Sequence, residues 1–509
     1  MPRYAAIDIG SNSVRMMVAE AGLDGLRILA QGRQVTRLGE SVFRSGNVSA
    51  EALDFLCGTL RRMAEDYRKF DIVGLRAVAT SAVRDAGNRQ EFINGVSAAI
   101  GAPVEVISGQ EEARLIHLGV NARWPRAKER TLIIDVGGGS AELIVSQGGE
   151  LLDATSRPLG AVRLKEVFLP GDPPASEELQ RLSQYIDEKL SPFVRRHQES
   201  KFDRAIATSS TGAALICALN RLPRSQRDKA DRLSAGTDDI KRFYKLLAKE
   251  NLDERRQWVG IGPRRAEIIV GGAAVFLRSL QALHHPLLYY SAAGVRDGII
   301  ADLATRGVGR ELATLSREQR TVVETMAKRY GTPLKHARNV ARLGRRLFEI
   351  TQSMHRLPPT AGKALEAAAY LHDIGHFVSS TGHHKHSAYL VANSDLPGFQ
   401  AQERMAIAAL CRFHRKAMPQ AQHAYLQNFP QEARRTVIYL APLLRIADSL
   451  DRGHEQKVRN VQMSVKNGSV IFLIESEDDP GLEVWAAGEA AAAFTQVYGL
   501  RVTVQRARP

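Results

Sequence analysis

The first 300 residues alternate between two spacings of apolar positions. Short, continuously apolar runs such as 4–9 and 131–136 are typical of buried strands. Longer stretches between them, such as 51–70, repeat apolar residues at helical spacing. Strands that alternate with helices in this way predict α/β domains. The pattern predicts strands at 4–9, 14–19, 26–32, 34–38, 72–79, 104–107, 131–136, 141–146, 149–155, 205–208 and 287–291, and helices at 51–70, 91–100, 111–120, 177–197, 237–251 and from 295 onwards.

The pattern changes near residue 307. Residues 316–452 have helical spacing almost throughout and are rich in His and Arg. Strands return from residue 458 onwards, around a helix at 489–498, and are predicted at 461–466, 470–475 and 500–505. We therefore expect four domains: α/β lobes at 1–128 and 129–303, an all-α domain at 304–456 and a small α+β domain at 457–509.

The two predicted lobes begin with the same plan. Residues 6–13 (AIDIGSNS) and 133–140 (IIDVGGGS) each place an Asp on an apolar strand and follow it with a Gly/Ser turn. The two aspartates, Asp8 and Asp135, lie 127 residues apart, a spacing that predicts duplicated lobes around a shared cleft. One glycine turn is weak evidence of a ligand site, but two matched turns are a specific signal.

Each Gly/Ser turn is a candidate phosphate site. A turn of this kind can aim several backbone N–H groups into one hollow that binds phosphate oxygens. Glycine is expected there because the backbone approaches the ligand closely and can need a positive φ. The candidate phosphate-binding residues are Gly10, Ser11, Asn12 and Ser13 in the first turn and Gly137, Gly138, Gly139 and Ser140 in the second.

Charged residues near the turns supply the remaining chemistry. Arg15 and Arg84 can bind phosphate bidentately. Glu111 and Glu112 open a predicted helix, where acidic pairs often only complement the helix dipole. Adjacent helical residues point about 100° apart, so one of the two can face the cleft as a base that activates water. Candidate oxygen ligands for a divalent cation are Asp8, Asp135 and Glu142.

The chain carries a net charge of +15. Residues 304–455 hold 22 Lys and Arg against 12 Asp and Glu, which gives +10 for that stretch. Such a basic surface favours polyanions by long-range attraction and counterion release, although it can also be a solubilising charge. The three cysteines are far apart, and neither a membrane span nor a signal peptide is apparent, so we expect a cytoplasmic protein with reduced thiols.

Four motifs, in this order and spacing, resemble the exopolyphosphatase / guanosine pentaphosphate phosphohydrolase family: DIGSNSVR, ATSAVRDAGN, SGQEEARL and DVGGGSAEL. The resemblance covers residues 1–300 and implies two actin-like, ribonuclease-H-like lobes around a cleft. It implies that Glu112 is the catalytic base. It also assigns the metal and phosphate site to Asp135, Glu142 and the glycines, and phosphate contacts to Ser11, Asn12, Arg15 and Arg84.

The resemblance implies hydrolytic release of orthophosphate, with Mg²⁺ or Mn²⁺, by a homodimer. Inorganic polyphosphate is the expected substrate because the basic C-terminal half suits a long polymer, and guanosine pentaphosphate is the alternative. A further alternative is a non-hydrolytic actin-like ATP-binding module, with an adenosine pocket from residues 270–274 and Ala293-Gly294. Specific nucleic-acid binding is not expected, because the basic residues lack interleaved aromatics.

The helical domain carries a second candidate metal site. An H…HD…D pattern resembles the HD phosphohydrolase superfamily, in which imidazoles and carboxylates on converging helices bind divalent metal ions. A helical scaffold whose His and Arg residues bind polyphosphate is the alternative. The candidate ligands are His336, His372, Asp373 and Asp448, and His383, His384, His386 and His414 are candidates for a second ion.

Overall fold

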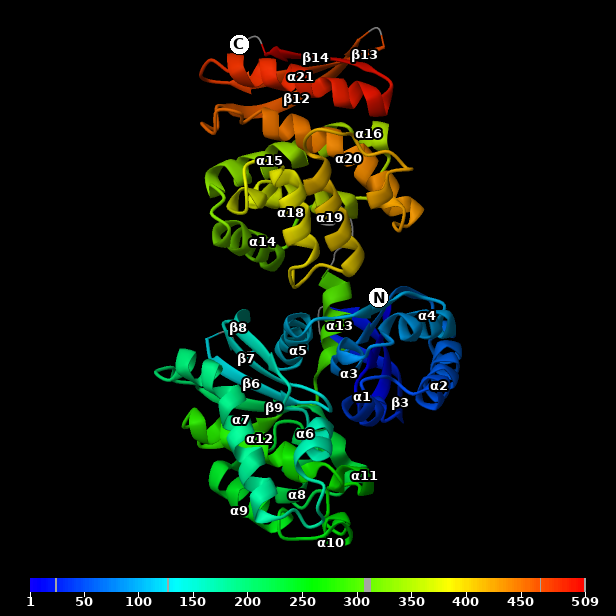
Figure 1. Cartoon of the computed structure of the whole chain (residues 1–509), viewed down its shortest axis with the longest axis vertical. Helices are drawn as coiled ribbons and strands as arrows, with labels where there is room; N and C mark the ends of the chain where they lie inside the picture. Colours follow the sequence, from blue (N-terminus) through cyan, green and yellow to red (C-terminus); the bar gives the residue numbers. More distant parts are fainter. Residues whose placement is uncertain (23–24, 126–127, 306–312, 467, 508–509) are drawn as a thin grey trace. The chain divides into compact units, whose positions relative to one another are not determined.

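The computed structural model describes residues 1–22, 25–125, 128–305, 313–466 and 468–507. These fall into two compact units, residues 1–305 and 306–509, which are described separately here (Figure 1). No helix in the described ranges combines the length and apolarity that a membrane crossing requires. The finer domain boundaries given above remain predictions.

Lobe I of the first unit is built on a five-stranded sheet in the order β3-β2-β1-β4-β5. Strand β1 pairs antiparallel with β2 and parallel with β4, and helices α2 and α4 pack against each other beside this sheet (Figure 1). Its elements are β1 (Arg3–Ile9), β2 (Ser13–Gly22), β3 (Gly25–Val35), α1 (Leu38–Ser45), α2 (Ala50–Arg68), β4 (Ile72–Ala79), α3 (Ser81–Asp85), α4 (Arg89–Ile100), β5 (Val104–Val106) and α5 (Gly109–Arg123).

Lobe II repeats this plan in a six-stranded sheet, β10-β11-β9-β6-β7-β8. Strand β6 pairs antiparallel with β7 and parallel with β9, as β1 does with β2 and β4, so the predicted duplication extends to topology. The elements are β6 (Arg130–Val136), β7 (Ala141–Gln147), β8 (Glu150–Arg157), α6 (Ala161–Phe168), α7 (Ser176–His197), β9 (Arg204–Thr208), α8 (Ser209–Leu219), η1 (Arg224–Ala230), β10 (Ser234–Gly236), α9 (Thr237–Leu247), α10 (Leu252–Arg256), α11 (Pro263–Ala266), α12 (Ile269–Ala282) and β11 (Leu287–Tyr290).

Three sequence predictions need correction. The predicted strands 26–32 and 34–38 form one strand, β3, and the chain enters α1 at Leu38 after Arg37 adopts a left-handed conformation (φ 55°). The predicted helix 237–251 ends at Leu247, because Asn251 caps the next helix, α10. Residues 270–274 form no adenosine loop, because they lie buried inside α12.

Helix α13 (Val295–Thr305) packs against α5 and β1 and returns the chain to lobe I. The close packing of α13 on α5 requires glycine at 298, because a Cβ there would lie 1.7 Å from the carbonyl oxygen of Leu115. A buried ion network also joins the two helices: Asp302 accepts from Arg76 (3.1 Å) and Arg114 (2.8 Å). The start of α5, which carries the predicted base, is therefore fixed firmly in lobe I.

The second unit is helical, with one small sheet in the order β12-β13-β14. Its apolar core is continuous from the helices into this sheet and α21. The elements are α14 (Arg317–Arg329), α15 (Leu334–Ile350), α16 (Gln352–His355), α17 (Thr360–Leu371), η3 (Ile374–Phe377), α18 (His383–Ala392), α19 (Ala401–Phe413), η4 (Ala424–Leu426), α20 (Gln431–Ser449), β12 (Val458–Lys466), β13 (Ser469–Ser476), α21 (Gly481–Tyr498) and β14 (Arg501–Arg506).

Candidate active site in the cleft between the two lobes

The two Gly/Ser turns line one cavity of about 580 Å³ between the lobes. Each turn joins the first two strands of its lobe and closes with the same hydrogen bond. The N–H of Gly10 donates to the Ser13 carbonyl (3.1 Å), and that of Gly137 donates to the Ser140 carbonyl (3.0 Å). The duplicated strand–turn–strand units therefore face each other, as a shared cleft requires.

The two turns approach so closely that side chains would not fit between them. A Cβ on Gly138 would lie 3.2 Å from the backbone nitrogen of Asn12, and one on Gly139 would lie 2.7 Å from Ser11 Oγ. None of the glycines in the two turns has a positive φ. Glycine is needed here for close approach of the backbones.

Backbone N–H groups in both turns remain available for a ligand. Within the described part of the chain, the N–H groups of Ser11, Asn12, Gly138 and Gly139 donate to no acceptor. Ser11 instead uses its hydroxyl to accept from the N–H of Ala82 (3.1 Å), which fixes the first turn against lobe I. Such a set of unpaired donors suits phosphate oxygens.

Four carboxylates gather at this end of the cleft: those of Asp8, Glu112, Asp135 and Glu142. Burial raises the pKa of Glu112 to about 7, and the negative charges of Asp8 and Asp135 add to the effect. Burial likewise raises the pKa of Asp135 to about 6, and it also raises the pKa of Asp8. Burial and the charges of Glu112 and Asp135 hold the pKa of Glu142 well above its ordinary value. The group is thus short of positive charge.

The two adjacent glutamates of α5 have separate partners. Glu111 lies in the buried ion network, where it accepts from Arg114 (2.7 Å) and Arg76 (3.0 Å). Glu112 lines the cavity and accepts from Arg84 Nη1 (2.9 Å). Arg84 also donates to the Ile107 carbonyl and does not itself line the cavity. The structure therefore places this arginine on the candidate base, although the sequence predicted a phosphate contact.

The carboxylates fit a divalent cation. Glu142 is completely buried, and Ser156 donates to its Oε1 (2.7 Å), but its Oε2 has no hydrogen-bond partner among the described residues. Thr208 donates its hydroxyl to Asp135 Oδ2, which orients that carboxylate. An all-oxygen donor set with an unpartnered buried oxygen suits Mg²⁺ or Mn²⁺.

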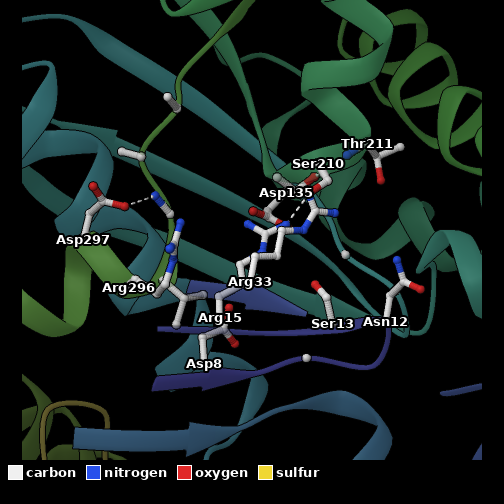
Figure 2. A pocket seen from close by; sticks show the side chains of 18 of the residues that line it. Asp8, Asn12, Ser13, Arg15, Arg33, Asp135, Ser210, Thr211, Arg296 and Asp297 are labelled. Atoms are coloured by element: carbon white, nitrogen blue, oxygen red, sulfur yellow. Dashed lines mark hydrogen bonds between the residues drawn. The ribbon is translucent and has the colours of Figure 1, made fainter. Parts of the chain in front are cut away.

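The other side of the cavity is positively charged. Arg15 and Arg33 extend from the strands of lobe I towards Ser210 of lobe II, and Arg15 donates to the Ser210 hydroxyl (Figure 2). Burial lowers the pKa of Arg15 to about 9 and that of Arg33 to about 10, and the repulsion of neighbouring arginines lowers both further. The same causes lower the pKa of Arg265, which also lines the cavity, to about 9.

The sequence analysis predicted only Arg15 among the cavity arginines. Arg33, Arg227, Arg265 and Arg296 also line the cavity, and no described carboxylate forms an ion pair with any of these five. Residues Ser209–Thr211 line it as well. One signal could have found these three: they follow β9, whose parallel neighbour β6 ends at the second glycine turn.

Comparisons with known proteins decide the family. A family model described as the Ppx/GppA phosphatase family matches residues 17–306, and another, described as Ppx/GppA phosphatase, domain III, matches residues 318–481. The chain belongs to the Ppx/GppA phosphatase family. Its two lobes accordingly have the actin-like fold of that family, and its activity is that of a phosphatase.

Solved structures of Ppx/GppA relatives align with the two lobes. An exopolyphosphatase-like protein is 29% identical, with a TM-score of 0.56, over 60% of this chain and 98% of its own. A Ppx/GppA family member from Aquifex aeolicus is 28% identical, with a TM-score of 0.52, over 60% of this chain and 98% of its own. An exopolyphosphatase from Cytophaga hutchinsonii is 25% identical, with a TM-score of 0.55, over 59% of this chain and 97% of its own.

The second unit brings together the four residues predicted there. His336 lies on α15 and Asp448 on α20, while His372 and Asp373 directly follow α17 and so lie just past the predicted helix. Asp448 Oδ1 is 3.5 Å from His336 Nε2 and 3.3 Å from His372 Nε2. Of the additional histidines, His383 contacts Asp373 (3.5 Å). His414 does so at 3.8 Å, as does His376, which the sequence analysis did not select, at 3.7 Å; His384 and His386 form no such contact in the described part.

Proposed function

We propose that this Ppx/GppA phosphatase is an exopolyphosphatase, which releases terminal orthophosphate from inorganic polyphosphate with Glu112 as the general base. One observation carries the proposal: beside its carboxylates the cavity is lined by five arginines that form no ion pair with a described carboxylate. Arginines that line a cavity without counterions favour a ligand that supplies several negative charges. A polyphosphate chain supplies a negative charge with every phosphate unit.

The positive side continues beyond the reactive end. A second cavity of about 450 Å³ shares five lining residues with the first and adds Arg224 and Arg264. Neither of these arginines forms an ion pair with a described carboxylate. The two cavities therefore offer a continuous arginine-lined path for phosphates behind the terminal one, which supports a polymeric substrate. The shared residues are Asn12, Arg33, Ser210, Arg227 and Arg265.

The lining offers little to a nucleobase. Among the described residues of both cavities, Tyr290 is the one aromatic side chain, and its hydroxyl lies 3.4 Å from an Arg227 nitrogen that donates to it. Bases are commonly held by stacking on aromatic faces. The composition of the path thus favours polyphosphate over guanosine pentaphosphate or ATP.

In the proposed reaction the terminal phosphoryl group lies in the cavity that the two turns line, beside Glu112. Glu112 accepts a proton from water as the water oxygen bonds to phosphorus and the bridging P–O bond breaks. The N–H groups of Gly138 and Gly139 stabilise the charge on the phosphoryl oxygens. A divalent cation held by Asp8, Asp135 and Glu142 supplies further charge neutralisation when bound. Arg84 holds Glu112 in place and favours its ionised form.

Phosphate release from long-chain polyphosphate, guanosine pentaphosphate and ATP, measured side by side, tests the substrate. We expect the highest kcat/KM for polyphosphate. Replacement of Arg265 by Met should raise the KM for polyphosphate about 10- to 100-fold, since a charge-assisted hydrogen bond contributes about 1.5–3 kcal/mol. Arg256→Met is the control, because Arg256 lines neither cavity and pairs with Asp253 (3.0 Å).

Two results would contradict the proposal. Faster cleavage of guanosine pentaphosphate than of polyphosphate at equal concentrations of chain ends would overturn the assigned substrate. Equal effects of the Arg265→Met and Arg256→Met variants would remove the arginine path as the binding site.

A further inference from the structure

The start of helix α6 packs directly on the second Gly/Ser turn. Gly160 precedes this helix and lies so close to the turn that a Cβ on it would be 2.3 Å from backbone atoms there. The backbone N–H of Ala161 donates to the Gly137 carbonyl (2.9 Å). That of Val162 donates to the Gly138 carbonyl (2.9 Å). None of the residues of α6, all of which are described, lines the cavity, so the helix holds the turn from behind.

The side chain of Arg163 holds the next carbonyl of the turn. Its Nε donates to the Gly139 carbonyl (2.8 Å), and its backbone N–H donates to that of Gly138 (3.1 Å). Because Arg163 is not among the residues that line the cavity, it acts on the turn and not on a ligand.

Holding the carbonyls fixes the direction of the N–H groups. The C=O and the N–H of a trans peptide group point in opposite directions. The Gly138 carbonyl shares a peptide group with the N–H of Gly139, and the Gly139 carbonyl shares one with the N–H of Ser140. Gly139 and Ser140 both line the cavity. The contacts from α6 therefore aim these N–H groups at the cavity, where phosphoryl oxygens would accept from them.

The guanidinium group of Arg163 also contacts lobe I. Its Nη2 pairs with Asp85 of α3 and donates to Ser81 Oγ (3.4 Å). The group lies over the ring of Phe43 in α1, with Cζ 4.0 Å from the ring centroid. Arginine can hold partners in several directions at once because its donors form a rigid, planar fork.

Helix α3 connects these contacts to the candidate base. Its Arg84 donates to Glu112 (2.9 Å). The backbone N–H of its Ala82 donates to Ser11 Oγ in the first turn (3.1 Å). One short helix of lobe I thus contacts the base, the first turn and Arg163. Because Arg163 also holds the second turn, it fixes the N–H groups of that turn relative to the base.

We propose that Arg163 is a positioning residue for phosphoryl transfer, which aligns the second Gly/Ser turn of lobe II with the base of lobe I. The inference rests on the proposed function for the roles of Glu112 and of the N–H groups. Such groups stabilise developing charge only when they point at the oxygens that carry it, and a misplacement of about 1 Å can cost roughly 100-fold in rate. Loss of Arg163 should therefore affect the transition state more than the binding of the polyphosphate chain.

Phosphate release from polyphosphate by the full chain is the primary test. We expect Arg163→Met to lower kcat about 10- to 100-fold with KM nearly unchanged, because the cavity arginines that bind the chain remain. Orthovanadate resembles the transferred phosphoryl group in the transition state, so its inhibition constant should rise by the same factor as kcat falls.

Arg44→Met is the matched control. Arg44 also joins α1 to α6, through Glu166 (2.7 Å), but it forms no hydrogen bond with either turn among the described residues. This variant should keep the wild-type kcat and the wild-type inhibition constant.

The vanadate measurement separates positioning from folding. If Arg163→Met were only partly folded, its apparent kcat would fall, but the folded fraction would keep the wild-type inhibition constant, and that result would overturn the inference. Should Arg163→Met not fold at all, Arg163→Lys takes its place, because an ammonium group keeps the charge but lacks the planar fork that reaches Gly139 and Asp85 together. A wild-type inhibition constant in Arg163→Lys would likewise overturn the inference.

The inference and the proposed function fail in different ways. A wild-type protein that releases phosphate from guanosine pentaphosphate but not from polyphosphate would overturn the proposed substrate, and the same variants would then be compared on the pentaphosphate with the same expected changes. Equal kcat and equal inhibition constants for Arg163→Met and Arg44→Met, in a protein whose wild type cleaves polyphosphate, would overturn the role of Arg163 alone.

Discussion

Replacing Glu112 by Gln should both make the first unit more stable and remove catalysis. Burial raises the pKa of Glu112 from 4.5 to about 7, so the folded state holds a proton that the unfolded state releases between these values. Stability therefore falls as pH rises through this window. A tenfold change in proton affinity corresponds to about 1.4 kcal/mol, so ionised Glu112 costs the folded protein about 3 kcal/mol at pH 8.

The neighbouring residue provides a control with the opposite sign. Buried Arg76 and Arg114 donate to Glu111 and lower its pKa, so its ionised form stabilises the fold. That stabilisation is present above the unfolded pKa and is lost as pH falls through the folded value. Glu111→Gln leaves the arginines short of negative charge and should destabilise the protein by about 3–5 kcal/mol at pH 8.

Calorimetry of the full chain in the presence of a chelator measures both effects. For a unit of this size about 2 °C corresponds to 1 kcal/mol, so Glu112→Gln should raise the relevant Tm by roughly 6 °C at pH 8 and by little near pH 4.5. Glu111→Gln should lower it. Mg²⁺ should reduce the gain in Glu112→Gln, because a cation near the carboxylates favours their ionised forms.

The same variant tests the catalytic role. Loss of a general base reduces kcat by about 10²- to 10⁴-fold, while binding of polyphosphate is retained. Glu112→Gln with wild-type kcat would refute the assignment of the base. A Tm that is unchanged or lower at pH 8 would refute the electrostatic reasoning, because the removed carboxylate would then carry no cost in the folded state.

Two further substitutions test the cation site and the approach of the two turns. Thr208→Val removes the hydroxyl that donates to Asp135, so the Mg²⁺ concentration for half-maximal phosphate release should rise about 10- to 100-fold; an unchanged Mg²⁺ dependence would contradict this role. Gly138→Ala places a Cβ 3.2 Å from the Asn12 nitrogen and should lower kcat/KM about 100-fold by moving the turns apart. Gly58→Ala, which meets nothing within 4 Å, should keep full activity, and equal activity of both variants would refute the close-approach argument.

Local patterns predicted the strands, the two matched turns and the helix that carries Glu112, because each of these is set by residues near one another in sequence. The arginine side of the cleft could not be predicted in the same way. Arg33 comes from the edge strand β3, Arg227 from η1 and Arg265 from α11, and only the tertiary fold brings them together. Similarly, the glycines in residues 270–274 allow close packing of a helix and do not form a loop.

Under the proposed function, the distribution of charge in the cleft also sets the direction in which the substrate enters. Asp8 and Arg15 are register partners on β1 and β2, so the boundary between the carboxylate and arginine groups runs through the sheet of lobe I. Each group is internally repulsive, since burial and, after it, like charges raise the pKa of Glu142 and lower that of Arg265. A divalent cation relieves the first group and a polyanion relieves the second. Under the proposed function the reacting phosphoryl group therefore lies at the boundary, beside Glu112, while the remaining polyphosphate chain follows the arginines.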